Sequence, residues 1–202
     1  GDLRVHQLAV PALEDAFADQ ENIVFDKRWR QVLQRLKSAD TVEFSLPSTL
    51  TVDLREYQLE AFRWLCRMDY LGTGACLADD MGLGKTVEAL ALLVHKAAKG
   101  PALVVAPTSV CTNWLEETHR FAPTLNPVVF AQSQRRETLA NLGAFDLLIC
   151  SYGLMAREIE MLSEVKWDTV ILDEAQAIKN MATERSKAAM ALQGNFRLIM
   201  TG

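Results

Sequence analysis

The sequence lacks the features of several protein classes. Its four cysteines, Cys66, Cys76, Cys111 and Cys150, lie far apart and form no Cys-x-x-Cys pair. This spacing argues against a zinc site or a disulfide framework and favours reduced, mostly buried thiols. No apolar run approaches the roughly 20 residues of a membrane span, and the N-terminal residues lack the apolar segment of a signal peptide. We therefore expect a cytoplasmic protein with no membrane partner.

An excess of positive charge is also missing. The chain has 21 Lys and Arg against 26 Asp and Glu, a net charge of −5, so it has no global attraction for nucleic acid. One stretch differs: residues 26–37 form a predicted amphipathic helix whose polar face is basic, with Lys27, Arg28, Arg30, Arg35 and Lys37. Such a face could touch phosphates, although a solvated helix surface is the commoner explanation. We predict that residues 1–45 are a helical appendage, and that 44–52 form a linker or an edge strand.

From residue 46 onwards, short apolar runs alternate with stretches of helical periodicity. The predicted strands are 75–78, 102–106, 127–131, 146–150, 169–173 and 196–200, and the predicted helices are 53–70 (capped by Asp53), 87–98, 109–121, 132–142, 154–164 and 183–192. Continuous apolar strands that alternate with helices predict an α/β fold, a mostly parallel sheet with helices on both faces. Ligands of such sheets bind at the carboxyl ends of the strands.

A glycine-containing loop, Asp79–Thr86, joins the first predicted strand to a helix. Gly82 and Gly84 allow backbone N–H groups to turn toward an anion at the helix N-terminus. Lys85 can reach the β- and γ-phosphates of a nucleotide, and the Thr86 hydroxyl can ligate Mg²⁺. The general phosphate-loop pattern has glycine where this chain has Asp79, and the alternative is a turn that binds nothing.

Two carboxylates, Asp173 and Glu174, follow the predicted strand 169–173 directly. Asp173 is placed to hold Mg²⁺ opposite Thr86, and Glu174 to orient and deprotonate an attacking water. Taken alone, such a pair could equally cap a helix. Its position at a strand end, after a phosphate loop, favours catalysis.

Together these motifs resemble those of the SWI/SNF-type ATPases of helicase superfamily 2. The sequence of the segment Asp173–Asn180 is most similar to the prokaryotic branch of that family. The resemblance covers about residues 50–202 and includes Asp79, which this family carries in its phosphate loop. The matching segments, in chain order, are Leu54–Gln58, Asp79–Thr86, Val104–Thr108 with Asn113–Glu117, Ser151–Gly153, Asp173–Asn180 and Met200–Gly202.

The resemblance implies roles for individual residues. Gln58, with Arg55 nearby, would bond the adenine edge, and the loop residues Met81, Gly82, Leu83, Gly84, Lys85 and Thr86 would hold the phosphates. Lys85, Asp173 and Glu174 would be catalytic, and Thr86 and Asp173 would bind the metal. Thr108, Asn113, Ser151 and Tyr152 could contact nucleic acid, whereas Trp114 is expected to pack in the core and not on a base.

The family's motor has two RecA-like lobes with ATP between them. Residues 46–202 resemble the first lobe, so the resemblance implies an ATP- and Mg²⁺-dependent DNA translocase in which a second lobe in cis supplies an arginine finger. Without that lobe we expect slow turnover, since such a finger is worth ~10³ to 10⁵ in rate. Duplex DNA is the implied partner, and the location would be the nucleoid in a prokaryote or the nucleus in a eukaryote. A self-contained P-loop NTPase or kinase, or a nucleotide-dependent docking module, are the alternatives.

Overall fold

The computed structural model describes residues 34–35, 38–39, 41–78, 84–130, 134–178 and 183–202. The chain divides into two compact units, 1–44 and 45–202. Gln34 and Arg35 are helical, but the rest of the helix predicted over 26–37 lies outside the described residues, as do Met81, Gly82 and Leu83. In the described part of the chain, no helix is long and apolar enough to cross a membrane.

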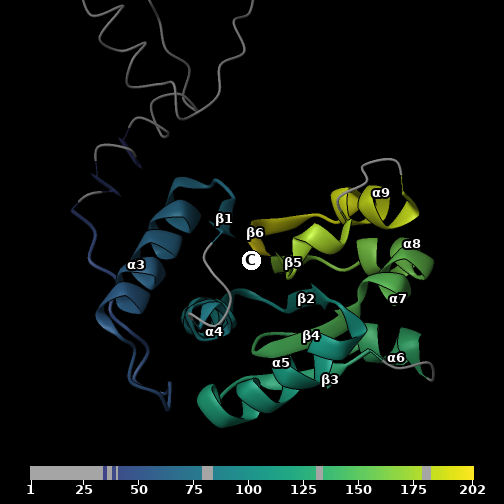
Figure 1. Cartoon of the computed structure of the whole chain (residues 1–202), viewed down its shortest axis with the longest axis horizontal. Helices are drawn as coiled ribbons and strands as arrows, with labels where there is room; N and C mark the ends of the chain where they lie inside the picture. Colours follow the sequence, from purple (N-terminus) through teal and green to yellow (C-terminus); the bar gives the residue numbers. More distant parts are fainter. Residues whose placement is uncertain (1–33, 36–37, 40, 79–83, 131–133, 179–182) are drawn as a thin grey trace, which may run out of the picture. The chain divides into compact units, whose positions relative to one another are not determined.

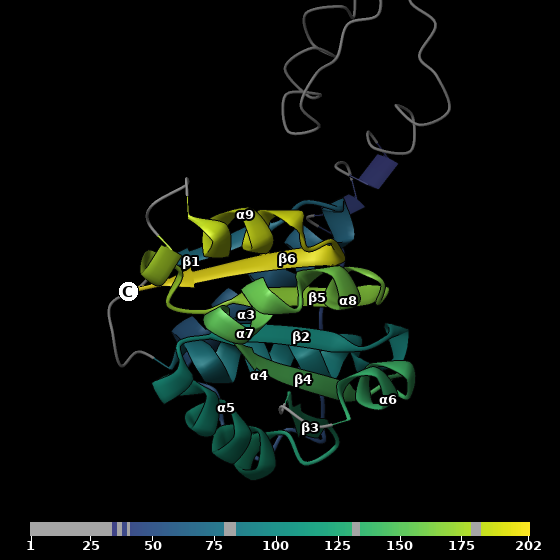
Figure 2. The ribbon, with the colours of Figure 1, turned by 90° about the vertical axis from the view of Figure 1, so that its right-hand side faces the viewer.

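The larger unit is built on a six-stranded sheet in which every pairing is parallel (Figures 1 and 2). The strand order is β1-β6-β5-β2-β4-β3. The strands are β1 (Ala75–Ala78), β2 (Ala102–Ala106), β3 (Asn126–Val129), β4 (Asp146–Ser151), β5 (Trp167–Leu172) and β6 (Gly194–Thr201). All carboxyl ends therefore lie at one edge of the sheet, where the chain's last residue is also found (Figure 2).

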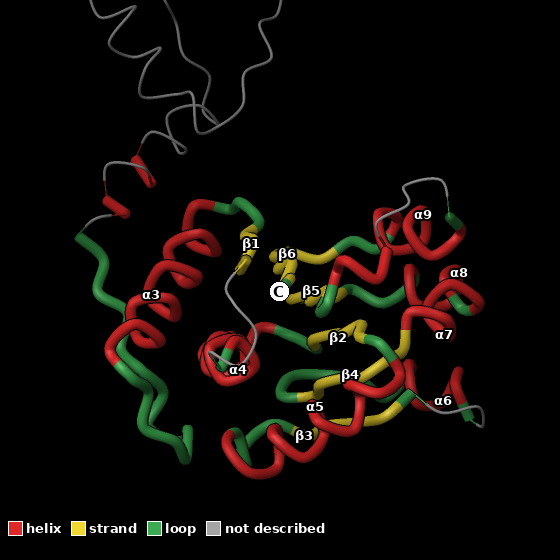
Figure 3. Tube along the Cα trace, in the orientation of Figure 1, coloured by secondary structure: helices red, strands yellow, loops and turns green. Residues whose placement is uncertain are grey.

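Helices cover both faces of this sheet, which confirms the predicted fold class (Figures 1 and 3). One face carries α3 (Glu56–Leu71), α4 (Lys85–Lys96) and α5 (Thr108–Phe121), and the opposite face carries α7 (Tyr152–Arg157), α8 (Ile159–Ser163) and α9 (Glu184–Ala191). The remaining short helix is α6 (Arg135–Ala140), and single helical turns occur at η2 (Ala97–Lys99) and η3 (Ala175–Ile178).

The two central strands explain why their sequences are uninterrupted apolar runs. Every residue of β2 and of β5 is buried, because both faces of the sheet are covered at its centre. Side chains of Leu103, Leu148 and Val170 pack in one apolar cluster with Met155 and Leu162, from the helices above them. This packed centre holds the strand ends in fixed positions.

Several predicted boundaries are wrong. The helix expected from an Asp53 cap begins at Glu56, with Arg55 as its N-cap. Of the two alternatives for residues 44–52, the linker is the one that the structure has: these residues form no strand, and Thr51 donates its backbone N–H to the Phe121 carbonyl at 2.9 Å.

The helices predicted over 132–142 and 154–164 also differ. Within the described residues the first of these is helical only over α6, Arg135–Ala140. The second is two short helices, α7 and α8, separated at Glu158, where φ and ψ are −112° and 22°. Glu158 also forms an ion pair with the Arg135 guanidinium, which is distant in the sequence. No glycine or proline stands at the break, so the local sequence gives no sign that the helix is interrupted there.

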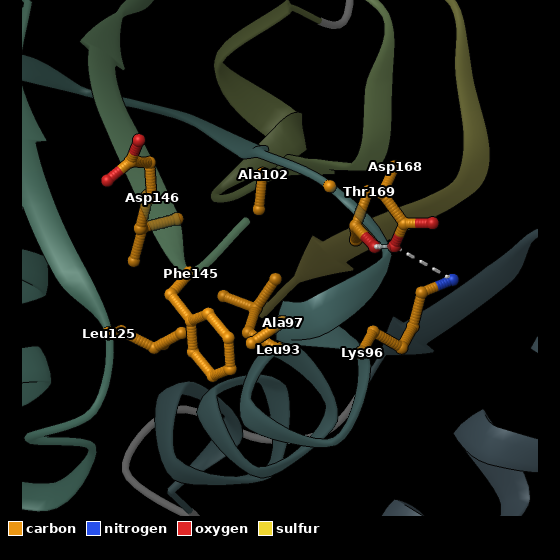
Figure 4. A pocket seen from close by; sticks show the side chains of 11 residues that line it. Leu93, Lys96, Ala97, Ala102, Leu125, Phe145, Asp146, Asp168 and Thr169 are labelled. Atoms are coloured by element: carbon orange, nitrogen blue, oxygen red, sulfur yellow. Dashed lines mark hydrogen bonds and ion pairs between the residues drawn. The ribbon is translucent and has the colours of Figure 1, made fainter. Parts of the chain in front are cut away.

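At the amino ends of the strands, opposite the predicted site, a buried cation links four elements. The Lys96 ammonium of α4 pairs with Asp69 of α3 and lies 3.4 Å from Asp168 of β5 and 4.9 Å from the Phe196 ring centre in β6. Asp168 also accepts a hydrogen bond from the Thr169 hydroxyl at 3.0 Å, beside a small hollow (Figure 4). This cluster fastens α3 and α4 to the sheet.

Candidate nucleotide site

The structure brings the predicted catalytic residues to the carboxyl edge of the sheet. Lys85 begins α4 after β1, and Asp173 directly follows β5. Both residues therefore lie at the same edge, although β1 and β5 are separated in the sheet by β6. Lys85 and Asp173 are both buried, with 9% and 5% of their surfaces exposed.

Gly84 stands at the start of α4 in a conformation that suits glycine. Its φ of 83° lies in the left-handed region, and an added Cβ would lie only 2.3 Å from the Gln58 amide nitrogen. The first backbone N–H groups of α4 follow immediately, at the positive end of the helix dipole. The loop glycine, the helix N-terminus and Lys85 thus occupy one small region, which is the arrangement that phosphate binding requires.

Gln58 lies beside this loop, as its predicted adenine role requires, but the structure also gives it a helix-capping role. Its side-chain oxygen accepts a hydrogen bond from the Arg55 backbone N–H at 3.0 Å, at the start of α3. Gln58 is 8% exposed and its amide nitrogen faces Gly84, whereas the Arg55 side chain is exposed. The adenine contacts of both residues stay predictions.

Asp173 is held from several sides. Its backbone N–H continues the sheet by donating to the Val105 carbonyl at 2.8 Å, and its carbonyl accepts from the Tyr152 hydroxyl at 2.8 Å. One carboxylate oxygen, Oδ1, accepts from the Glu174 backbone N–H, and the other, Oδ2, accepts from the Trp114 indole N–H, each at 2.8 Å. The carboxylate therefore has a defined orientation.

Burial is the largest influence on the ionisation of Asp173, and it raises the pKa of this carboxyl above its usual value. The hydrogen bonds from Trp114 and from the Glu174 N–H lower the pKa, the Glu174 charge raises it, and the Lys85 charge lowers it. The net shift of the Asp173 pKa is upward, because burial disfavours the charged carboxylate. A cation bound beside this carboxylate would stabilise its charged form.

Glu174 adopts an unusual backbone conformation for a residue with a side chain, with φ of 48°. Its carboxylate accepts a hydrogen bond from the Gln176 side-chain amide, and the Gln176 oxygen accepts from the Thr201 hydroxyl at 2.8 Å. A chain of hydrogen bonds thus runs from the end of β6 to the carboxylate predicted to orient water. The strained backbone and this chain of contacts both fix where Glu174 points.

The residues predicted to contact nucleic acid separate into two groups. Thr108 and Asn113, on α5, are exposed, although the Asn113 amide donates to Glu117 at 3.1 Å. Ser151 caps α7 by accepting the Leu154 N–H, and Tyr152 is only 3% exposed, with its hydroxyl directed at Asp173. Surface position therefore suits the first pair better than the second, and all four contacts stay predictions.

The donor set fits Mg-nucleotide. Within the described ranges, no three His, Cys, Asp or Glu side chains are grouped as a metal site. The donors predicted for this site, the Thr86 hydroxyl and the Asp173 carboxylate, are oxygen donors of the kind that Mg²⁺ prefers. A Mg²⁺ ion usually takes one or two carboxylates and completes its shell with substrate phosphates and water, so a phosphate-bearing ligand on Lys85 would supply the rest.

Sequence reasoning missed three polar contacts of this site. Trp114 is fully buried, which confirms its predicted place in the core, but its N–H also orients Asp173. Gln176 was part of a recognised motif without an assigned role, and Thr201 had none either. Periodicity cannot reveal such contacts, because each one joins residues that are distant in the sequence or lie within one short loop.

Comparisons with known proteins agree with this geometry. A family model described as "SNF2-related domain" matches residues 57–202. YwqA of Bacillus subtilis (strain 168), named as a candidate ATP-dependent helicase/translocase, is 38% identical over 190 residues, which is 89% of this chain and 21% of that protein. The chromatin-remodeling ATPase INO80 of Cryptococcus neoformans is 37% identical over 179 residues, 81% of this chain and 10% of INO80.

Among solved structures, the SWI2/SNF2 ATPase core of Sulfolobus solfataricus in complex with dsDNA has a TM-score of 0.71 and 38% identity to this chain. The match covers 79% of this chain and 34% of that one. The chain thus spans only about a tenth to a fifth of these two curated relatives. The matched family, the identity and the all-parallel sheet together show that this chain belongs to the SNF2-related family of helicase-like ATPases and contains the first RecA-like lobe of its ATPase core.

Proposed function

We propose that this chain is the nucleotide-holding half of a DNA-stimulated translocase that hydrolyses ATP with Mg²⁺. The observation that carries the proposal is that Lys85, at the N-terminus of α4, and the buried Asp173 carboxylate, directly after β5, both lie at the carboxyl edge of the sheet. This arrangement supports a phosphate-binding role for Lys85 and a metal-binding role for Asp173.

Each residue has a distinct task in this proposal. Lys85 and the N–H groups at the start of α4 bind the β- and γ-phosphates, and Thr86 and Asp173 hold the metal, which neutralises charge that develops on the phosphates. Glu174, fixed by its backbone and by Gln176, orients the attacking water and accepts its proton. Gln58 and Arg55 bond the adenine edge.

The DNA part of the proposal is supported by the exposed side chains of Thr108 and Asn113 and by the relative solved with dsDNA. The net charge of −5 gives no general attraction for DNA, so contacts must be local. A second lobe in cis would complete the cleft and supply an arginine. By itself, the first lobe would then bind Mg-nucleotide weakly and turn it over slowly.

Binding of a fluorescent ATP analogue tests the nucleotide site. The chain, Lys85→Ala and the control Lys99→Ala would be titrated in Mg²⁺, with far-UV circular dichroism to check folding. Lys99 lies in η2, beyond the far end of α4, and its side chain is 55% exposed. We expect Lys85→Ala to lose about tenfold or more in affinity, as is usual for a hydrogen bond to a charged ligand, and Lys99→Ala to bind normally. Equal affinities for all three proteins would refute the phosphate-binding role.

Turnover distinguishes the proposal from a self-contained NTPase or kinase. ATP hydrolysis by this chain would be compared with hydrolysis by a protein that also carries a second lobe, each with and without duplex DNA. We expect DNA to stimulate only the two-lobed protein, because only there is the cleft complete. Equal, DNA-independent rates would favour the self-contained enzyme, and binding without any hydrolysis in either protein would favour the docking module.

A further inference from the structure

The Trp114 side chain has a polar contact that its place in the core does not require. A buried indole N–H needs a hydrogen-bond acceptor, and a backbone carbonyl can fill this need. Trp167, which is 2% exposed, shows that solution: its N–H donates to the Leu162 carbonyl at 2.8 Å. Trp114 instead donates at the same distance to the carboxylate of Asp173.

This contact determines where the carboxylate points. The other oxygen of Asp173, Oδ1, accepts the Glu174 backbone N–H, so each carboxylate oxygen is held by its own donor. Each carboxylate oxygen can still accept further contacts, because it has two lone pairs. The oriented carboxylate therefore remains able to bind a cation or the water of a hydrated cation.

The main chain at Asp173 has its own support. The Tyr152 hydroxyl donates to the Asp173 carbonyl, which belongs to the peptide that joins Asp173 to Glu174. Tyr152 lies in the first turn of α7, whereas Trp114 comes from the middle of α5, on the opposite face of the sheet. Two helices on opposite faces thus hold the same residue.

We infer that Trp114 and Tyr152 are positioning residues for the metal site: Trp114 orients the Asp173 carboxylate toward the cation, and Tyr152 fixes the peptide that follows it. This inference rests on the proposed function, because it takes Mg²⁺ as the cation at Asp173. Donors that orient a metal ligand commonly change metal affinity or activity by about 10- to 100-fold when they are removed. The same size of effect is expected here for the indole N–H.

The test compares the metal's contribution to nucleotide affinity in matched variants. The dissociation constant of a fluorescent ADP analogue would be measured in Mg²⁺ and in EDTA. The ratio of the constant in EDTA to the constant in Mg²⁺ reports how much the metal contributes to affinity. Trp114→Phe keeps the aromatic core and removes the N–H donor. Trp167→Phe removes an equally short, buried N–H bond that does not reach Asp173.

We expect Trp114→Phe to lower this ratio about tenfold while the affinity in EDTA stays that of the wild type. Tyr152→Phe should lower it by a smaller factor, and Trp167→Phe should leave it unchanged. An unaltered affinity in EDTA shows that a variant is folded, so a general loss of stability cannot imitate the result.

Two results would overturn the inference, and they differ in meaning. If the wild type gains affinity from Mg²⁺ and Trp114→Phe gains as much, Trp114 has only a packing role, while the proposed function stands. If the wild type gains nothing from Mg²⁺, the metal role of Asp173 fails as well. A decrease for Trp167→Phe equal to that for Trp114→Phe would also reject a specific role for Trp114.

Discussion

The contact between Gln58 and Gly84 makes the phosphate loop and the start of α3 energetically dependent on each other. An added Cβ on Gly84 would lie 2.3 Å from the Gln58 amide nitrogen, far inside van der Waals contact. Gly84→Ala therefore forces the Gln58 side chain to move. Since the Oε1 atom of the same side chain accepts the Arg55 N–H at 3.0 Å, we expect the movement of its amide nitrogen to break this helix cap as well.

The size of the effect follows from two contributions. Alanine at a φ of 83° costs about 1–2 kcal/mol, because Cβ crowds the backbone in the left-handed region. Loss of the hydrogen bond at the cap adds about 0.5–1.5 kcal/mol. We expect Gly84→Ala to lower the free energy of unfolding by about 1.5–3.5 kcal/mol, the sum of these two ranges.

Urea denaturation followed by circular dichroism measures this change. With a slope of about 2 kcal/mol per molar urea, the midpoint should fall by roughly 1 M. Gly143→Ala is the matched control, because nothing lies within 4 Å of its added Cβ. That variant should change stability by less than about 0.5 kcal/mol.

A double-mutant cycle isolates the contact. Gln58→Ala removes both the cap and the obstacle, so in that background Gly84→Ala should cost only the backbone strain. The combined loss should then be smaller than the sum of the single losses by about 0.5–1.5 kcal/mol, the share of the cap. Additivity within about 0.3 kcal/mol would refute the coupling between Gln58 and Gly84.

Three further predictions concern the rest of the unit. Lys96→Met leaves the buried Asp168 carboxylate without its cation, and leaves the partly buried Asp69 with only Lys99, so it should destabilise the chain by about 3–5 kcal/mol in urea, whereas Lys99→Met, at an exposed site, should have little effect. Burial raises the pKa of Asp69, but the hydrogen bonds and charges of Lys96 and Lys99 together lower it more, so the net pKa lies below its usual 3.8. The stability that the ion pair of Lys96 and Asp69 contributes is therefore present above pH 3.8 and is lost as the pH falls through the lower, folded-state pKa of Asp69. We expect Lys96→Met to remove the part of the acid sensitivity that Lys96 causes, measured by urea midpoints at several pH values. Iodoacetamide followed by mass spectrometry should label exposed Cys76 first, and Cys150 only after unfolding, because burial raises the pKa of its thiol to about 12; early labelling of Cys150 would contradict its position in the core.

The sheet was predictable because its strands carry their own signal. A strand buried on both faces must be apolar throughout, so β2 and β5 are visible as uninterrupted runs, and parallel pairing follows from the helices between them. The helix boundaries were less predictable. Asp53 and Glu56 have the spacing of a capping box, yet the chain caps α3 two residues later through Gln58. The competing cap uses a side chain that is also held against Gly84, and only the tertiary structure brings those two residues together.

The candidate site also has a part that the sequence reveals and a part that it does not. Lys85, Thr86, Asp173 and Glu174 could be placed near strand ends from the sequence, because each motif has a fixed spacing from a strand, while their roles stay predictions. Their supports could not, because hydrogen bonds such as that from Trp114 to Asp173 join residues 59 positions apart. A tryptophan in an amphipathic helix is correctly predicted to be in the core, and nothing in its periodicity tells which acceptor its N–H will find.

The two positioning residues also lie in the segments whose resemblance implied contact with nucleic acid. Trp114 follows Asn113 directly on α5, and Tyr152 follows Ser151 at the start of α7. In each segment, one residue reaches the surface or caps the helix while its neighbour reaches Asp173. Motifs assigned to separate tasks in the sequence therefore meet at one carboxylate in the structure, through the Trp114 and Tyr152 hydrogen bonds.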